Sequence, residues 1–234
     1  MAVHRLMRPL LAGAALACLP APAAAVIYYA HSIEGWVLDA RSGKPIEGVV
    51  VVAHWQLRAG SLGGGGPAIR ELQISEAVTD EKGRYYFPSW GPRFALRGNL
   101  ESRSPELLYF KSGYRARGLA NEWHRGMDTT RSEWHGKTVK LEPFDGSPAE
   151  YAEHLSSLSA TLWIVGFAVG EHSGDYCGWK SFPRILSALD RVESDFRAAG
   201  VVQGTVVSSL RSNDGILKAK RCGSVTEVLG ARPK

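Results

Sequence analysis

Two segments of the same kind, at positions 33–52 and 77–87, constrain the fold of this chain more than any other feature. Each has the pattern of a strand, a short polar turn and a second strand, with the turns at positions 39–45 and 80–83. The turns contain Asp, Ser, Gly and Pro, which favour tight reversals of the backbone. The pattern therefore predicts an antiparallel β domain.

Further strand-like runs continue beyond these two segments. We expect seven strands, near positions 33–39, 47–56, 71–79, 84–89, 107–111, 113–119 and 137–142. The four valines at 49–52 form a continuous β-branched run, which is typical of a strand covered on both faces. Seven short strands separated by turns suit a small sandwich of two packed sheets. The sequence thus predicts a mainly β fold, with an Ig-like sandwich as its architecture.

The same strands resemble a known family. The resemblance is carried by Ile33, Gly35, Val37, Asp39, Ser42, Gly43, Lys44, Pro45, Ile46, Gly48 and Val49, and by Thr79, Asp80, Gly83, Arg84, Tyr85 and Phe87. In this spacing they resemble the carboxypeptidase regulatory-like domain, which implies a transthyretin-like β-sandwich. Members of that family occur as accessory domains of carboxypeptidases, as stalk repeats of surface proteins and at the front of outer-membrane transporters. The module supplies no catalytic residues in these settings, and a shared fold does not specify a function.

A smaller, mainly helical region is expected after the β domain. Ser147 and Glu150 have the spacing of a capping box, with Pro148 at the first helical position. This predicts a helix at 148–159, and an extension through the apolar residues 162–169 stays open.

The clearest helical pattern lies at positions 182–199. Its apolar residues recur at helical spacing: Phe182, Ile185, Leu186, Leu189, Val192 and Phe196. Charged residues, Glu193 among them, are expected mostly off this stripe, and Gly200 is expected to end the helix. Packing on the chain's own fold is the favoured role of the stripe, and partner binding is the alternative. In the following stretch, β-branched residues at 201–207 favour a strand, whereas 216–220 favours helix.

The first 25 residues have the pattern of an export signal. Arg5 and Arg8 precede an apolar run at 10–19, and small residues at 23–25 suit cleavage. The apolar run is shorter than the roughly 20 residues that cross a bilayer, so no transmembrane span is expected. We expect a soluble mature chain, periplasmic or secreted. Cys18 leaves a minor alternative open, because the residues before it loosely resemble a lipoprotein cleavage box, and a lipid anchor would then be attached there.

Charge argues against one class of partner. The formal net charge of +5 falls to +3 when Arg5 and Arg8 leave with the signal. So small an excess, in an exported protein, does not favour nucleic acid. The expected partner is an envelope protein or a glycan whose identity the sequence does not give.

Cys177 and Cys222 are the two cysteines that follow the signal. Exported proteins meet an oxidising compartment, so a structural disulfide between them is expected. A metal site is disfavoured, because neither a Cys-x-x-Cys motif nor a suitably spaced His accompanies the pair.

A repeated Glu-Trp-His motif is the most distinctive polar feature of the chain. It occurs at 122–124 and again, eleven residues later, at 133–135. Packing of the two tryptophans onto the core is the favoured interpretation. The alternative is a binding surface made of Trp123, His124, Trp134 and His135. A small metal-dependent hydrolase that uses segment 122–135 is a further alternative, although the spacing is not that of known zinc enzymes.

Three other apparent sites are better explained as local structure. His31 and Glu34 match His-x-x-Glu, but alternation along a strand places them on opposite faces. The polar residues at 172–175 are too close in sequence to form a catalytic triad, and the glycines at 63–66 lack the continuation of a phosphate-binding loop. We therefore assign no catalytic, cofactor-binding or metal residue.

Together these features predict three parts: a signal peptide at 1–25, a carboxypeptidase regulatory-like sandwich at 26–143 and a helical extension with a disulfide at 144–234. The predicted function is that of a non-catalytic, exported binding or scaffold module of the bacterial cell envelope, without a cofactor.

Overall fold

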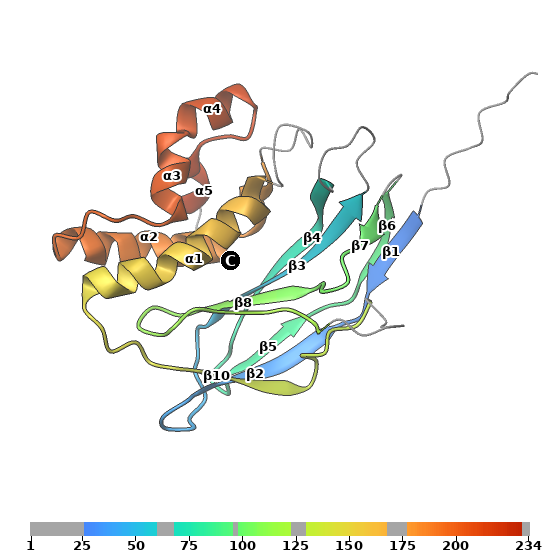
Figure 1. Cartoon of the computed structure of the whole chain (residues 1–234), viewed down its shortest axis with the longest axis horizontal. Coiled ribbons are helices and arrows are strands. Elements are labelled where there is room, and N and C mark those ends of the chain that lie inside the picture. The colour runs from blue at the N-terminus through green and yellow to red at the C-terminus, as the bar shows by residue number, and fades with distance from the viewer. Residues whose placement is uncertain (1–25, 60–67, 96–97, 123–129, 168–176, 231–234) are drawn as a thin grey trace, which may run out of the picture.

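The computed structural model of the chain describes residues 26–59, 68–95, 98–122, 130–167 and 177–230. Strands occupy the first part and helices the last part (Figure 1). The strands are β1 (Val26–Ala30), β2 (Ile33–Asp39), β3 (Val50–Ala59), β4 (Ala68–Val78), β5 (Arg84–Phe87), β6 (Trp90–Ala95), β7 (Asn99–Leu100), β8 (Glu106–Phe110), β9 (Arg117–Leu119) and β10 (Lys137–Leu141). The helices are α1 (Pro148–Phe167), a 3-10 turn η1 (Gly178–Ser181), α2 (Pro183–Ala198), α3 (Val206–Ser212), α4 (Asp214–Ala219) and α5 (Val225–Gly230).

The described strands form three sheets. The largest has the order β4-β3-β8-β9, with the short β7 paired to β3, and the second has the order β10-β2-β5. β1 pairs with β6 in a sheet of its own. Every pairing is antiparallel except that of β10 with β2. The coarse prediction, a mainly β fold followed by a smaller helical part, is confirmed.

The strand count differs from the prediction. The described residues form ten strands, whereas seven were expected. The additional strands are β1, β6 and β7. β6 contains a Gly-Pro pair, and a Pro within a run argues against a strand. The segment expected as a strand at 113–119 contributes only β9 and an isolated bridge between Tyr114 and Pro143.

β3 lies between the two largest of three hydrophobic clusters in the described residues. Its odd-numbered residues, such as Val51 and Trp55, pack with residues of β2, β5 and β10. Its even-numbered residues Val50 and Val52 pack with apolar side chains of the helices. The continuous valine run thus predicts correctly a strand covered on both faces. The helices cover one face of the sheet that contains β3 and β8, and the sheet of β10, β2 and β5 lies on the other side (Figure 1).

The helical prediction holds for α1 and α2 and for the region of α4 at 216–220, whereas the strand favoured at 201–207 is not formed. The capping box exists, because the Glu150 carboxylate accepts hydrogen bonds from Ser147 N and Oγ at 2.7 and 2.8 Å. α1 continues to Phe167, as the longer of the two open alternatives requires. Gly200 ends α2 with a φ of 75°.

Residues 201–207, expected as a strand, are irregular and then begin α3. Thr205 is the N-cap of this helix, and its Oγ1 accepts a hydrogen bond from Val207 N at 3.2 Å. The β-branched residues Val206 and Val207 are helical because their side chains are buried among the other helices. Tertiary packing here overrides a weak local preference.

Carboxylates from other elements cap α2, α3 and α5. Phe182 precedes α2 and offers no capping side chain. Instead Glu76 on β4 accepts hydrogen bonds from Arg184 N at 2.9 Å and from Ile185 N at 2.8 Å. An anion at a helix N-terminus satisfies free N–H groups and interacts favourably with the helix dipole. Burial raises the pKa of Glu76 to about 7. The two backbone hydrogen bonds and the charge of Arg184 lower this pKa, but burial has the larger effect.

α3 receives the same kind of cap from within the helical part. The Glu193 carboxylate accepts hydrogen bonds from Thr205 N, Thr205 Oγ1 and Ser208 N at 2.6, 2.5 and 3.0 Å. Glu193 is 2% exposed, so it does not lie off the apolar stripe as the periodicity suggested. At α5, Asp214 accepts a hydrogen bond from Val225 N at 2.7 Å. Each cap joins two elements that are separate in sequence.

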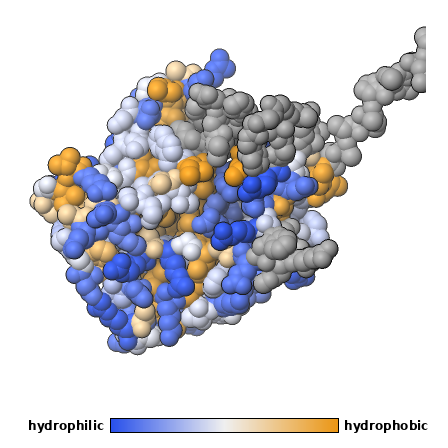
Figure 2. Space-filling model, viewed as in Figure 1, coloured by the Kyte–Doolittle hydropathy of each residue, from blue (hydrophilic) through white to orange (hydrophobic). Residues whose placement is uncertain are grey.

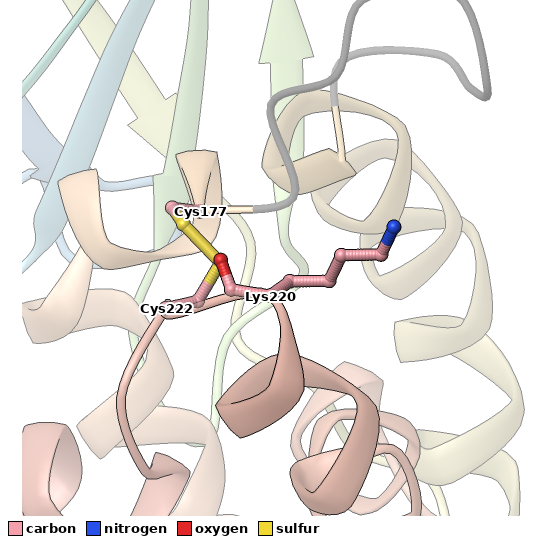
Figure 3. Close-up of a disulfide and its surroundings, with 3 residues drawn as sticks. All are labelled: Cys177, Lys220 and Cys222. Carbon is pink, nitrogen blue, oxygen red and sulfur yellow. A yellow bond between two sulfur atoms is a disulfide. The ribbon is translucent and has the colours of Figure 1, made fainter.

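Cys177 and Cys222 lie at disulfide distance, with their sulfurs 2.06 Å apart (Figure 3). The bond links the start of η1 to the segment between α4 and α5. Cys222 is fully buried in the helical core, and the carbonyl oxygen of Lys220 lies 3.8 Å from its sulfur (Figure 3).

Helix length and surface hydropathy can both be described. Within the described residues, none of the helices is long and apolar enough to cross a membrane. On the face drawn in Figure 2, hydrophilic residues cover most of the surface and hydrophobic residues gather in small groups. The predicted signal at 1–25 lies outside the described residues.

Candidate functional site

The most unusual polar cluster is a buried histidine between two glutamates. His54 on β3, Glu71 on β4 and Glu106 on β8 come from three neighbouring strands of the largest sheet. His54 Nδ1 lies 3.4 Å from Glu71 Oε2, and His54 Nε2 lies 3.4 Å from Glu106 Oε2. The imidazole is 2% exposed. Both distances exceed a normal hydrogen bond, so the contacts are ion pairs.

Electrostatics keep this histidine protonated. Burial lowers the pKa of His54, but the contacts with Glu106 and Glu71 and the charges of both carboxylates raise it to about 9. The contact with His54 in turn lowers the pKa of Glu106, against the opposing effect of burial. At neutral pH the cluster is therefore an imidazolium between carboxylates, which is a poor general base.

A small polar cavity opens beside the cluster. It has a volume of about 280 Å³ and is lined by residues that include His54, Arg58, Glu101, Arg103, Ser104 and Glu106. Arg58 Nε is paired with the Glu101 carboxylate. The two nitrogens of His54 face carboxylates on opposite sides of the ring, so one metal ion cannot share all three groups. Consistent with this geometry, no group of three possible metal ligands occurs among the residues that the structure describes.

The pKa of His54 predicts a pH-dependent stability. Because the folded pKa of about 9 lies above the ordinary histidine pKa of 6.5, the stabilisation is complete below about pH 6.5 and is lost as the pH rises through about 9. The loss is at most about 3 kcal/mol. Urea denaturation at several pH values measures it, and His54→Gln should remove this part of the pH profile. His135→Gln, which changes an exposed imidazole, should keep it. A wild-type profile that is flat between pH 6.5 and 9 would contradict the assignment.

A second candidate site is a groove between α2 and the sheet, with a volume of about 710 Å³. Its apolar lining is made by Val50, Val78, Phe110 and Ala188. Its charged lining is made by Lys111, Arg184, Arg191 and Asp195. Small-molecule sites in proteins are commonly concave, apolar and of this size, with a few charged groups. The groove is therefore the better candidate for binding, and the histidine cluster for stabilising the sheet.

The structure describes two of the four residues of the proposed Trp-His surface, Trp134 and His135. Trp134 is partly buried against the β core and donates a hydrogen bond from Nε1 to the carbonyl oxygen of Ala120 at 3.2 Å. Lys137 Nζ lies 5.3 Å from the centre of its ring. His135 is exposed, and its Nδ1 accepts a hydrogen bond from Glu34 N at 3.3 Å. Trp123 and His124 lie outside the described residues.

The other apparent sites of the sequence have structural explanations or fall outside the structure. Glu34 pairs with Arg84 on the neighbouring strand, and the N–H of His31 bonds to the carbonyl oxygen of Thr130. The polar loop at 172–175 and the glycines at 63–66 lie outside the described residues. His54 was not singled out from the sequence, because its two partners are separated from it by 17 and 52 positions and have no common motif.

The comparisons with known proteins give little information about family or function. The chain matches no family model. It is similar to a solved structure of a 9R-lipoxygenase from Cyanothece PCC8801, with 11% identity and a TM-score of 0.24, over 82% of this chain and 28% of that one. The chain thus spans less than a third of that protein's length. A similarity this low carries no argument about fold or function.

Proposed function

We propose that this protein is a non-catalytic binding or scaffold module, exported to the bacterial cell envelope. In this proposal, residues 26–143 form a carboxypeptidase regulatory-like, transthyretin-like sandwich, and residues 144–234 form its helical extension. The disulfide between Cys177 and Cys222 is compatible with an oxidising compartment. Two sheets support this part of the proposal: β10-β2-β5 would be one layer of the sandwich, and β4-β3-β8-β9 would be the other.

The groove beside α2 is the observation that carries the binding function. The groove combines an apolar surface with charged groups. The ionisable groups His54, Glu71 and Glu106 of the sheet instead contact one another. The Glu76 carboxylate accepts hydrogen bonds from the start of α2 and so joins this end of the helix to β4 beside the groove. A preformed site binds with a smaller entropic cost than one that must be ordered.

Cross-linking in the living cell tests the binding function. A photoreactive amino acid replaces Ala188, which lines the groove, and in a matched variant it replaces Lys44, which is exposed in a turn remote from α2. The full chain, including residues 1–25, is expressed so that the host can process and export it. We expect position 188 to form adducts with an envelope component and position 44 to form none. Equal labelling of both positions would contradict a binding role for the groove.

Activity assays test the non-catalytic part of the proposal. The purified protein should turn over no substrate in a panel of peptides, esters and glycosides. The rival proposal is a metal-dependent hydrolase that uses segment 122–135, for which the exposed ring of His135 is the supporting observation. Turnover together with stoichiometric zinc, both lost in His124→Ala/His135→Ala, would establish the hydrolase and overturn our proposal.

Fractionation tests the location. Cells that express the full chain should release it with the periplasmic or secreted proteins. If it stays with the membranes and Cys18→Ala releases it, a lipid anchor at Cys18 replaces the free form in the proposal.

A further inference from the structure

The apolar surface of the groove is built from the sheet and one helix. Val50 on β3 and Phe110 on β8 are directly paired across the two strands, and both side chains are buried. Val78 at the end of β4 is 39% exposed, and Ala188 on α2 lines the same groove. An apolar chain that enters here gains free energy by leaving water.

The charged groups of the groove are mostly positive. Three of them are cations, Lys111, Arg184 and Arg191, and one is a carboxylate, Asp195. Lys111 Nζ lies over the turn at Gly48, 2.9 Å from the place where a Cβ on that glycine would lie. Any side chain at position 48 would therefore displace this ammonium group. The φ of 73° at Gly48 also favours glycine there.

Two of these cations have no carboxylate partner in the described part of the chain. Neither Lys111 nor Arg191 forms an ion pair with a described Asp or Glu. Arg191 Nε donates a hydrogen bond to the carbonyl oxygen of Ser187 at 3.3 Å, which leaves its charge uncompensated. An anionic group that binds between these side chains would make charge-assisted hydrogen bonds.

We propose that the groove binds an amphiphile with a single apolar chain and an anionic head, of which a long-chain carboxylate is the simplest example. The chain lies on Val78 and Ala188, above the buried Val50 and Phe110, and the head lies between Lys111 and Arg191. This inference rests on the proposed binding function and names the ligand class of the same site.

Calorimetric titration with dodecanoate, below its micelle concentration, tests the inference. Dodecyltrimethylammonium carries the same chain with a cationic head, and acetate carries the same head without the chain. We expect dodecanoate to bind at least about tenfold more tightly than either compound, a difference that calorimetry resolves easily. Equal affinity for the two dodecyl compounds would overturn the role of the cations, and equal affinity for acetate and dodecanoate would overturn that of the apolar surface.

Matched variants locate the binding. Lys111→Gln/Arg191→Gln removes two positive charges from the groove, and Lys44→Gln/Lys82→Gln removes two from exposed turns elsewhere. The first pair should weaken dodecanoate binding at least about tenfold, and the second by less than about twofold. Ala188→Phe should block the groove and abolish binding. Urea denaturation of each variant confirms that it is folded. Equal losses in the two charge pairs, or full binding by Ala188→Phe, would overturn the assignment.

A wrong ligand class can be distinguished from a failure of the proposed binding function. If dodecanoate does not bind but position 188 still cross-links to an envelope protein, the ligand class is wrong and the binding function stands. If dodecanoate does not bind and position 188 forms no adduct, both proposals fail.

Discussion

Replacing Glu193 with alanine is expected to lower the free energy of unfolding by about 2 to 4 kcal/mol, because buried hydrogen-bond donors lose their charged acceptor. Glu193 lies on α2 with 2% of its surface exposed, and its carboxylate accepts three hydrogen bonds at the start of α3. Arg197 and Arg211 lie 3.7 and 3.9 Å from the same carboxylate. Alanine would leave the donors of Thr205 and Ser208 unsatisfied in a buried position.

Two further variants separate the causes of this loss. Glu193→Gln keeps an oxygen that can accept a hydrogen bond but loses the charge, so it should cost less than alanine. Asp195→Ala removes an exposed carboxylate two residues away on the same helix and should change stability by less than about 0.5 kcal/mol. Urea denaturation followed by circular dichroism measures all three. If Glu193→Ala and Asp195→Ala have equal effects, the cap does not stabilise the helical part.

The sequence predicted the contacts that are local. Ser147 and Glu150 are three residues apart and form the expected capping box. The turn residue Asp80 accepts hydrogen bonds from Lys82 N and Arg84 N, both at 2.9 Å. Such contacts depend on residue type and spacing alone, and therefore a single sequence contains them.

The contacts that the sequence did not predict are those between distant residues. Glu76 caps a helix that begins more than a hundred positions later, and no spacing rule connects the two. Glu193 was placed among solvent-facing charges because periodicity assigns a charged residue to the polar face. Its burial follows from the position of α3 beside α2, which is a tertiary property. The same holds for Val206 and Val207, whose β-branched side chains suggested a strand.

The candidate sites show the same difference between local contacts and contacts of distant residues. The repeated motif at Trp134 and His135 favours packing of the tryptophan over a binding surface, and in the structure Trp134 packs against the β core. The groove beside α2 combines residues of β3, β4, β8 and α2, and the His54 cluster combines three strands. Strand alternation indicates which face a residue occupies, but it does not indicate which strands become neighbours. A site made by strand neighbours therefore requires the sheet order.

These long-range caps have a consequence for the helical part. α3, α4 and α5 have seven, six and six residues, shorter than helices that are stable alone in water. Their stability must come from packing, from the carboxylate caps and from the disulfide. Cys222 follows Arg221, whose φ of 62° reverses the chain at the end of α4. The N–H groups of Cys222 and Arg221 bond to the carbonyl oxygens of Leu217 and Lys218, which fixes the position of the cysteine.

Removing the disulfide is therefore expected to destabilise the protein strongly. Cys177 and Cys222 are 45 positions apart, and a loop of that length corresponds to about 4 kcal/mol in the chain-entropy model. Because the effect arises in the unfolded chain, Cys177→Ala/Cys222→Ala should keep the helical signal in circular dichroism while its urea midpoint falls. Reduction of the wild type with dithiothreitol should give the same shift, and Cys18→Ala should give none.

The same comparison decides how the short helices are held. If the double variant keeps the groove and loses only unfolding free energy, the caps and the core suffice to arrange α3, α4 and α5, and the disulfide acts on the unfolded state. If α2 stays folded but the helices around Cys222 lose protection from hydrogen exchange, the bond is needed for the native arrangement itself. A loss below about 1 kcal/mol would contradict both accounts, since it would mean that the bond closes a loop already restricted in the unfolded chain.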